Sequence, residues 1–424
     1  MRSHKPAIGF IFVTLLLEVI GFGLLIPVAP RLIAELQGVT LDEAARPSGW
    51  LMATYAAMQF LCAPTLGALS DHFGRRPVLL ASLLGSGLDY FAMALAPSLW
   101  LLFVTRAING ISGASMTVAN AYIADVTPPE KRAAAFGLVG AAFGLGFILG
   151  PVIGGVLADP EVHLPLIGPG HLRLPFYVAG GITLANWLYG YLIVPESLPR
   201  ERRAQISFAK ANPVGVFEGL GSYPVVAKLT VAMFLFNLAQ FGLHMTWVVY
   251  TAHRFGWSPR EVGFSLGMVG ICAAVVQAGL ARRVVPLLGE KRALLLGLAI
   301  GTLSYVGYGL ATEGWMMYLV IALGSLGGIA MPAGQSLITR SVRPDEQGRV
   351  QGAITGMNSI AQILGPLIGT SVFAYFVSDK APFVLPGAAF FVGALLAIGG
   401  WFVAARAVRG WMAPAAPAGA VAAG

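Results

Sequence analysis

Long apolar segments alternate with short polar ones along the whole chain. A helix needs about 20 mostly apolar residues to cross a bilayer core of about 30 Å. The first half carries such segments at residues 8–30, 48–69, 77–96, 99–121, 134–157 and 175–195. After a polar stretch the pattern resumes at residues 224–250, 260–284, 291–311, 315–338, 349–376 and 384–406. The pattern therefore predicts an all-α membrane protein with twelve transmembrane helices.

Composition supports this prediction. The chain is 57% hydrophobic and only 11% charged, whereas a soluble chain carries about 25% charged residues. Its first apolar run extends to Val28, includes Glu18 and ends without a small-residue cleavage site, so we expect a retained helix and no signal peptide. Cys62 and Cys272 fall in different predicted helices with no further thiol or histidine at ligand spacing. Neither a disulfide framework nor a metal site is expected.

Basic residues predict the orientation. Of the 27 lysines and arginines, 20 fall at the termini and in the even-numbered loops, 6 fall in the odd-numbered loops, and Arg106 falls within the fourth span. Loops rich in Lys and Arg stay in the cytoplasm. We therefore expect both termini to be cytoplasmic, and we attribute the excess positive charge to topology rather than to nucleic-acid binding.

The two halves of the chain resemble each other. Three short sequences return in order at an offset of about 215 residues: Gly150-Pro-Val-Ile-Gly154 as Gly365-Pro-Leu-Ile-Gly369, Leu88-Asp-Tyr90 as Leu303-Ser-Tyr305, and Val126-Thr-Pro-Pro-Glu130 as Val342-Arg-Pro-Asp-Glu346. Parallel six-helix repeats with a substrate site between them are a transporter architecture. The sequence thus predicts pseudo-symmetric bundles at residues 1–198 and 224–411, a cytoplasmic linker at 199–223 and a flexible cytoplasmic tail at 412–424.

The loop between spans two and three has a specific pattern, Gly67-Ala-Leu-Ser-Asp71-His-Phe-Gly74-Arg75-Arg76. Gly74 permits a tight reversal, the two arginines anchor the loop at the cytoplasmic face, and Asp71 is left at a helix end where it can pair with cations. An ordinary basic loop is the alternative. We expect a gating group made of Gly67, Asp71, Gly74, Arg75, Arg76, Asp125 and Arg132. The second-half equivalent, residues 279–292, is degenerate.

Span five is rich in small residues. It contains Gly144, Gly146, Gly150, Pro151, Gly154 and Gly155. Such residues let helices approach closely, and the proline introduces a kink. A packing surface with no bearing on the direction of transport is the alternative.

Three charges lie within the spans of the first half: Glu18, Asp89 and Arg106. Ionisable groups inside a membrane are costly and usually functional. On span four, a polar stripe recurs at three- and four-residue steps: Arg106, Asn109, Gly113, Thr117 and Asn120. We expect this stripe to face a central cavity, with a purely structural ion pair of Asp89 and Arg106 as the alternative.

The second half has no acidic residue deep in its spans. It offers neutral polar side chains instead: Asn237, Gln240, His244, Gln277, Gln335, Asn358 and Gln362. Together with nearby aromatic residues, they suit a large, partly planar organic ligand. His244 is the one titratable group among them, and a hydrogen-bonding wall residue is its alternative role.

Several of these patterns together carry a resemblance that covers nearly the whole chain. They are Glu18-x2-Gly21-x-Gly23, the loop 67–76, Asp89-Tyr90, Ala121-Tyr-Ile-Ala-Asp125, the span-five motif at 146–155, Pro195-Glu-Ser197 and Gly289-Glu-Lys-Arg-Ala293. With them the chain resembles the tetracycline–proton antiporter branch of the major facilitator superfamily, whose antiporter motif the span-five pattern matches. The resemblance implies that Asp89 is a carboxylate needed for coupling or drug binding, and that Glu18 stands where the family usually has aspartate.

Two positions depart from the family pattern. Gly301 stands where the tetracycline exporters carry an aspartate in span nine, and Ala273 stands where they carry a histidine in span eight. Any proton coupling should therefore rest on Glu18 and Asp89.

These observations predict a proton-coupled exporter of a drug-like organic solute that works by alternating access in the cytoplasmic membrane. The proton gradient would supply the energy, no cofactor is expected, and the partners would be the solute, protons and lipid, with the protein acting as a monomer. A facilitator or symporter for a sugar, organic acid or other metabolite is the main alternative, and a non-transporting receptor is a remote one. The chain lacks a nucleophile–base or metal constellation that would point to an enzyme.

Overall fold

A computed structural model describes residues 5–113, 115–128, 131–165, 168–204, 223–343, 346–409 and 411. Most of the predicted linker and the predicted tail lie outside these residues. The first half contains α1 (Lys5–Leu25), α2 (Ala29–Gln37), α3 (Leu41–Phe73), α4 (Arg75–Ala94), α5 (Leu99–Ser112), α6 (Ser115–Val126), α7 (Arg132–Ala158), a short hairpin of β1 (His163–Leu164) and β2 (Gly168–Pro169), and α8 (Leu174–Ile193). The second half contains α9 (Pro224–Phe255), α10 (Pro259–Val275), α11 (Ala281–Leu288), α12 (Glu290–Leu310), α13 (Gly314–Gly324), α14 (Ala330–Arg340), α15 (Gln347–Val377) and α16 (Ala388–Arg409).

Each predicted span coincides with a helix or with a run of consecutive helices. The eighth span is α10 and α11 joined by a π-helical turn at Val276–Leu280, and the tenth is α13 and α14 joined by a 3-10 turn at Ser325–Ile329. The first span bends by 44° between α1 and α2. These breaks were not predicted, because a run of apolar residues specifies helix but not its local winding.

Fewer than twelve segments meet a strict criterion for crossing a membrane. Within the described residues, eight helical segments are long and apolar enough, or nine if the bent pair α1–α2 counts as one span. The predicted spans at α3, α5–α6 and α8 fall short. The fourth span is divided between two short helices, and α8 carries tyrosines and Asn186 that lower its hydropathy.

Sequence signals explain where the helices begin. Thr40 and Glu43 form a capping box at the start of α3, and Ser258 and Glu261 form the corresponding box at the start of α10. In each box the hydroxyl accepts a backbone N–H of the first turn while the glutamate accepts the N–H of the capping residue. The boxes therefore open corresponding helices of the two halves in the same way.

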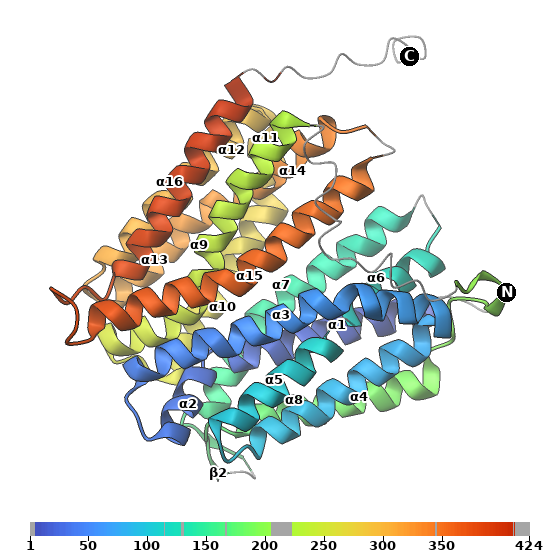
Figure 1. The fold of residues 1–424 in the computed structure, drawn as a ribbon, viewed down its shortest axis with the longest axis horizontal. Coiled ribbons are helices and arrows are strands. Elements are labelled where there is room, and N and C mark those ends of the chain that lie inside the picture. The colour runs from blue at the N-terminus through green and yellow to red at the C-terminus, as the bar shows by residue number, and fades with distance from the viewer. Residues whose placement is uncertain are drawn as a thin grey trace.

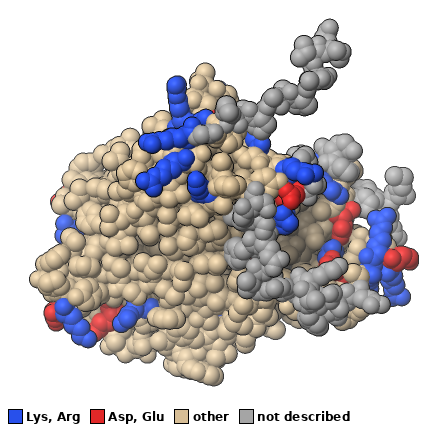
Figure 2. Space-filling model, turned by 45° about the horizontal axis from the view of Figure 1, so that its top comes forward, with Lys and Arg blue, Asp and Glu red and all other residues tan. Residues whose placement is uncertain are grey.

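The helices form two groups that meet side by side (Figure 1). The helices α1–α8 pack together, as do α9–α16, and the groups join where α3 packs along α15 and α7 packs along α10. We call the end that carries the loop 67–76, the start of α9 and the end of α16 the basic end. The close inter-half contacts of α3 and α10 involve their N-terminal parts, at Gly49 and between Pro259 and Gly270, so the halves are joined toward the end away from the basic end, here named the opposite end. Figure 2 shows the surface hollowed between the halves on the side of the basic end.

Candidate functional site

A buried ion pair lies inside the first half. Asp89 is on α4 and Arg106 on α5, and both side chains are 2% exposed. The Arg106 Nη2 donates to Asp89 Oδ2 at 3.3 Å. The guanidinium also lies 5.4 Å from the centre of the Tyr55 ring of α3, where a cation is attracted to the face of the ring. Two of the three charges that the sequence places within the spans therefore pair with each other.

The polar groups of this pair are not fully satisfied. Among the described residues, Asp89 Oδ1, Arg106 Nε and Asn109 Nδ2 are buried and have no hydrogen-bond partner. A buried polar atom without a partner costs about 1–3 kcal/mol. Three such atoms lie around one ion pair. This arrangement is typical of a site that binds water, protons or a polar ligand.

Other predicted residues of the first half surround this pair less closely. Glu18 on α1 is half-buried and lies within electrostatic range of Tyr55 and Tyr90. Asn120 on α6 is half-buried, and its Oδ1 has no hydrogen-bond partner among the described residues. The stripe from Arg106 to Asn120 is interrupted between α5 and α6, so its members do not share one unbroken helix.

In the second half, the predicted amides pair with each other and with a tyrosine. Asn237 on α9 donates to Asn358 on α15 at 2.8 Å. The Tyr305 hydroxyl of α12 donates to Gln240 Oε1 at 3.0 Å. Gln335 and Gln362 are half-buried on α14 and α15. The tyrosine was missed as a partner, although it belongs to the repeated segment 303–305.

His244 lies between the halves. Its ring packs against Phe241 of the same helix and against Phe147 of α7, with centroids 5.9 and 5.6 Å away. It is thus part of an aromatic contact that joins the first half to the second.

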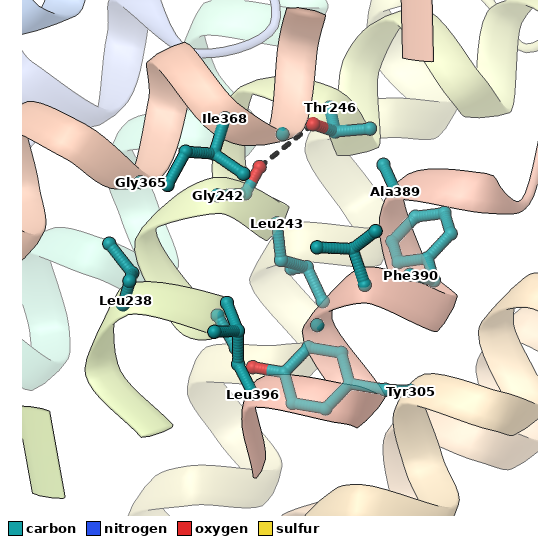
Figure 3. Close-up of a pocket in the computed structure, with 14 residues that line it drawn as sticks. Leu238, Gly242, Leu243, Thr246, Tyr305, Gly365, Ile368, Ala389, Phe390 and Leu396 are labelled. Carbon is teal, nitrogen blue, oxygen red and sulfur yellow. Dashed lines mark hydrogen bonds between the residues drawn. The ribbon is translucent and has the colours of Figure 1, made fainter. Parts of the chain in front are cut away.

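A small pocket in the second half is separate from these groups. Helices α9, α12, α15 and α16 line it with Leu238, Gly242, Tyr305, Gly365 and Phe390 among others (Figure 3). Its lining is mostly apolar and contains no ionisable residue besides Tyr305. The pocket therefore does not correspond to the predicted central cavity.

The loop motif forms a compact charged group at the basic end. Gly74 has φ 106°, a conformation that favours glycine, and it joins α3 to α4. Arg75 then lies between two carboxylates, 2.6 Å from Asp71 and 3.1 Å from Asp125 of α6. The loop is thereby fixed to the end of α6.

The remaining basic residues of the predicted gating group bind backbone carbonyls. Arg76 donates to the Tyr191 carbonyl at 2.7 Å, and Arg132 donates to the Ala124 carbonyl at 3.1 Å. Arg132 is therefore fixed to the end of α6, the helix that also carries Asp125.

Glu196, which had no predicted role, holds the loop in place. Its Oε1 accepts the backbone N–H groups of Arg75, Ser197 and Leu198 at 2.8, 3.0 and 3.1 Å. A carboxylate at the first turn of α4 satisfies free N–H groups and complements the helix dipole. The acidic residue that follows span six was the available signal.

The antiporter motif makes contacts both within its half and across to the other. A Cβ on Gly150 would lie 2.8 Å from the Gly23 Cα of α1. On the other face, a Cβ on Gly155 would lie 2.4 Å from the Pro259 carbonyl, and one on Gly263 would lie 2.4 Å from the Pro151 carbonyl. Helices α7 and α10 can come this close only without side chains. Span five of the first half therefore packs against span eight of the second.

Charged residues of both halves add to this contact at the opposite end. The His253 ring of α9 lies 2.8 Å from Asp42 of α3, and Arg260 of α10 lies 4.0 Å from Asp159 at the end of α7. Arg31 of α2 donates to the Trp257 carbonyl. We call these three contacts, together with Gly155 and Gly263, the seal. From the sequence, its two arginines were counted only as loop residues, and its aspartates and His253 were given no role.

Comparisons with known proteins agree with this architecture. The family model described as Major Facilitator Superfamily matches residues 11–366 and, in a second match, 286–421. The class C tetracycline resistance protein of Escherichia coli is 41% identical over 93% of this chain and 95% of its own length. The class B protein of Escherichia coli is 35% identical over 84% of this chain and 86% of its own length.

Solved structures share the fold. The human organic anion transporter MFSD10 superposes with a TM-score of 0.69 at 26% identity, covering 95% of this chain and 100% of its own. A bacterial homolog of the human lysosomal transporter Spinster, in an inward-facing and occupied conformation, gives a TM-score of 0.78 at 16% identity, covering 97% and 98%.

Proposed function

Because this chain belongs to the major facilitator superfamily, we propose that it is a proton-coupled secondary transporter that exports a drug-like organic solute, of the kind that tetracycline resistance proteins act on. It is a multi-pass membrane protein whose family handles small molecules within the bilayer. We place it in the inner membrane as a monomer, with both termini in the cytoplasm and the proton gradient, without a cofactor, as its energy source.

One observation carries the proposal: the buried pair of Asp89 and Arg106 with its unsatisfied polar atoms. A carboxylate beside an arginine can exchange its partner for a proton, which changes the charge of the site by one unit. Moving one charge across 100 mV is worth about 2.3 kcal/mol, enough for roughly fiftyfold accumulation of solute. The neutral amides of the second half, paired as Asn237 with Asn358, would contribute hydrogen bonds to the solute.

The two ends of the molecule support alternating access. The seal closes the opposite end through backbone contacts and ion pairs. Toward the basic end, by contrast, a Cβ on Gly137, Gly140 or Gly144 of α7 would meet nothing within 4 Å. With the basic end in the cytoplasm, this is an inward-facing state, and export requires the six-helix halves to rock so that the seal opens.

Packing around Gly301 bears on the coupling. A Cβ at this position would lie 2.7 Å from the Phe236 ring, which in turn packs edge-on against Tyr305. An aspartate could enter here only if the ring moved. The coupling carboxylates are therefore Glu18 and Asp89, and the aromatic residues in this region favour a planar, partly apolar solute.

The test is proton flux in proteoliposomes with a panel of solutes that includes tetracycline, sugars and organic acids. We expect an inward proton gradient to drive accumulation of tetracycline or another polycyclic solute, with stoichiometric proton movement. Transport of a sugar or an organic acid down its gradient, without proton movement, would overturn the proposal.

A further inference from the structure

The two halves carry corresponding ion pairs at the basic end, and their charges are exchanged. In the first half, Arg75 begins α4 and lies 3.1 Å from Asp125 of α6. The residues 215 positions further along are Glu290 and Arg340, and the Glu290 Oε1 lies 3.2 Å from the Arg340 Nη1. An arginine on the loop and a carboxylate on the helix have thus become a carboxylate on the loop and an arginine on the helix.

The backbone shows that these pairs correspond in space as well as in sequence. Gly74 precedes the first loop residue with φ 106° and ψ 158°, and Gly289 precedes the second with φ 75° and ψ 153°. Ser70 of α3 accepts from Arg75 and Ser336 of α14 donates to Glu290, although these two serines do not occupy repeat-related positions. The loop of the second half, which looks degenerate as a sequence, therefore keeps the conformation and the ion pair of the first.

A further repeat-related position is also reversed, and one is not. Lys131 is the residue that precedes α7, and Glu346 is the residue that precedes α15, so the two correspond by their place in the fold, although the repeated segment aligns Glu346 with Glu130. Arg76 and Lys291, which are also 215 positions apart, are both positively charged. Each lies over an aromatic ring of its own half: Arg76 is 5.7 Å from the centre of the Tyr191 ring, and Lys291 is 5.3 Å from the centre of the Trp411 ring. At the position where the charge has the same sign in both halves, the side chain is thus engaged in a contact within its own half.

Exchanged charges matter because of the pseudo-twofold relation between the halves. When two halves related by such an axis close on each other, a residue near the axis meets its own counterpart. Like charges would then repel, whereas opposite charges attract and favour the correct partner surface. Helices α6 and α14, which end at or beside Asp125 and Arg340, lie in different halves (Figure 1).

We propose that Asp125 and Arg340 exchange their local partners for each other when the basic end closes, so that the reversed charges hold the closed state. Both are available, since their side chains are 25% and 56% exposed. The partners that they leave are not stranded: Arg75 keeps Asp71 at 2.6 Å, and Glu290 keeps the Ser336 hydroxyl. This inference rests on the alternating access of the proposed function, but not on the identity of the solute.

The experiment follows closure of the basic end with one reporter cysteine. Gly140→Cys is placed in a background with Cys62→Ala and Cys272→Ala, because position 140 is exposed with open space around it. Closure of the basic end protects this thiol from alkylation by a polar maleimide. A parallel background with Asp42→Asn weakens the seal, which raises the closed population so that protection is measurable without solute or gradient.

Three variants are compared in both backgrounds. Arg340→Glu places two carboxylates opposite each other, and we expect the alkylation rate to rise about fivefold in the Asp42→Asn background, where the closed state is populated. The exchange Glu290→Arg with Arg340→Glu restores a local pair but still faces Asp125 with a carboxylate, so the rate should stay equally high. The control Arg282→Gln removes an exposed arginine of α11 and should change nothing.

The outcomes separate the roles. Recovery of the starting rate in the double exchange would show that Glu290 and Arg340 only brace their own half. No change in Arg340→Glu would show that the charge has no part in closure, and either result overturns the proposal. Arg340→Gln adds no repulsion and should give a smaller increase in the alkylation rate. It replaces Arg340→Glu in the comparison if the charge reversal prevents folding. Alkylation needs no transport, so failure of the proton-flux assay would count against the proposed function alone.

Discussion

Substituting Asp89 should both destabilise the protein and uncouple it from protons. Asp89→Asn leaves Arg106 charged in an environment where both side chains are 2% exposed. Breaking a buried pair costs about 3–5 kcal/mol when the remaining charge is left without a partner, and the Tyr55 ring, which stays 5.4 Å from the guanidinium, lowers this cost by about 1–2 kcal/mol. We therefore expect a net loss of about 2–3 kcal/mol in the free energy of unfolding, or a factor of roughly 30 to 150 in the equilibrium constant.

A double variant provides the control for this magnitude. Asp89→Asn with Arg106→Gln leaves no buried charge in the pair, so it should be more stable than Asp89→Asn alone. The assay is denaturant unfolding of purified protein in mixed micelles, analysed as a double-mutant cycle. If the two single losses simply add in the double variant, the ion pair contributes nothing and the reasoning fails.

The functional consequence is measured on the same proteins. Solute-induced proton release should be lost in Asp89→Asn and reduced in Glu18→Gln, whereas solute binding and downhill exchange should persist. Undiminished release in both variants would rule out these carboxylates as proton carriers. The coupling would then have to involve His244, or the protein would be a facilitator.

Three further predictions concern the gates. Asp71→Asn should lower the turnover rate about tenfold while leaving solute affinity nearly intact; a fall in affinity with unchanged exchange would contradict a gating role. Gly263→Val places a side chain where a Cβ already lies 2.4 Å from a carbonyl oxygen, so it should hold the opposite end open and abolish transport, whereas Gly181→Val, in open space, should be neutral in the same vesicle assay. His253→Gln breaks the 2.8 Å contact with Asp42 in the seal, so it should let the opposite end open more often and speed equilibrium exchange in the same vesicles. An unchanged exchange rate would show that this contact has no part in closing the opposite end.

The helices could be predicted from the sequence because each one follows from a local property. About 20 apolar residues in a row specify a membrane helix whatever surrounds them, and the repeated Gly-Pro segments indicated the two halves. The turns of altered winding at Val276–Leu280 and Ser325–Ile329 could not be predicted in this way. Their hydrogen-bond pattern depends on the helices that pack against them.

The candidate site was predictable in its residues but not in its contacts. Asp89 and Arg106 stood out because charges are rare in apolar segments. The seal did not, since His253 and Asp42 are 211 positions apart and become partners only through the placement of the halves. The exchanged pairs could not be predicted in this way, because a repeat is recognised by identical or similar residues. Here the ion pairs occupy equivalent positions in the two halves, but the residues carry opposite charges.

The glycine contacts of the seal have a consequence for the energy supply of the cell. Where Gly155 faces the Pro259 carbonyl and Gly263 faces the Pro151 carbonyl, the backbones leave no room even for a methyl group, and therefore none for a column of water that could conduct protons. A transporter closed in this way does not conduct protons while no solute is bound. A cell could carry many copies of it in its membrane and lose little of its proton-motive force until there is something to expel.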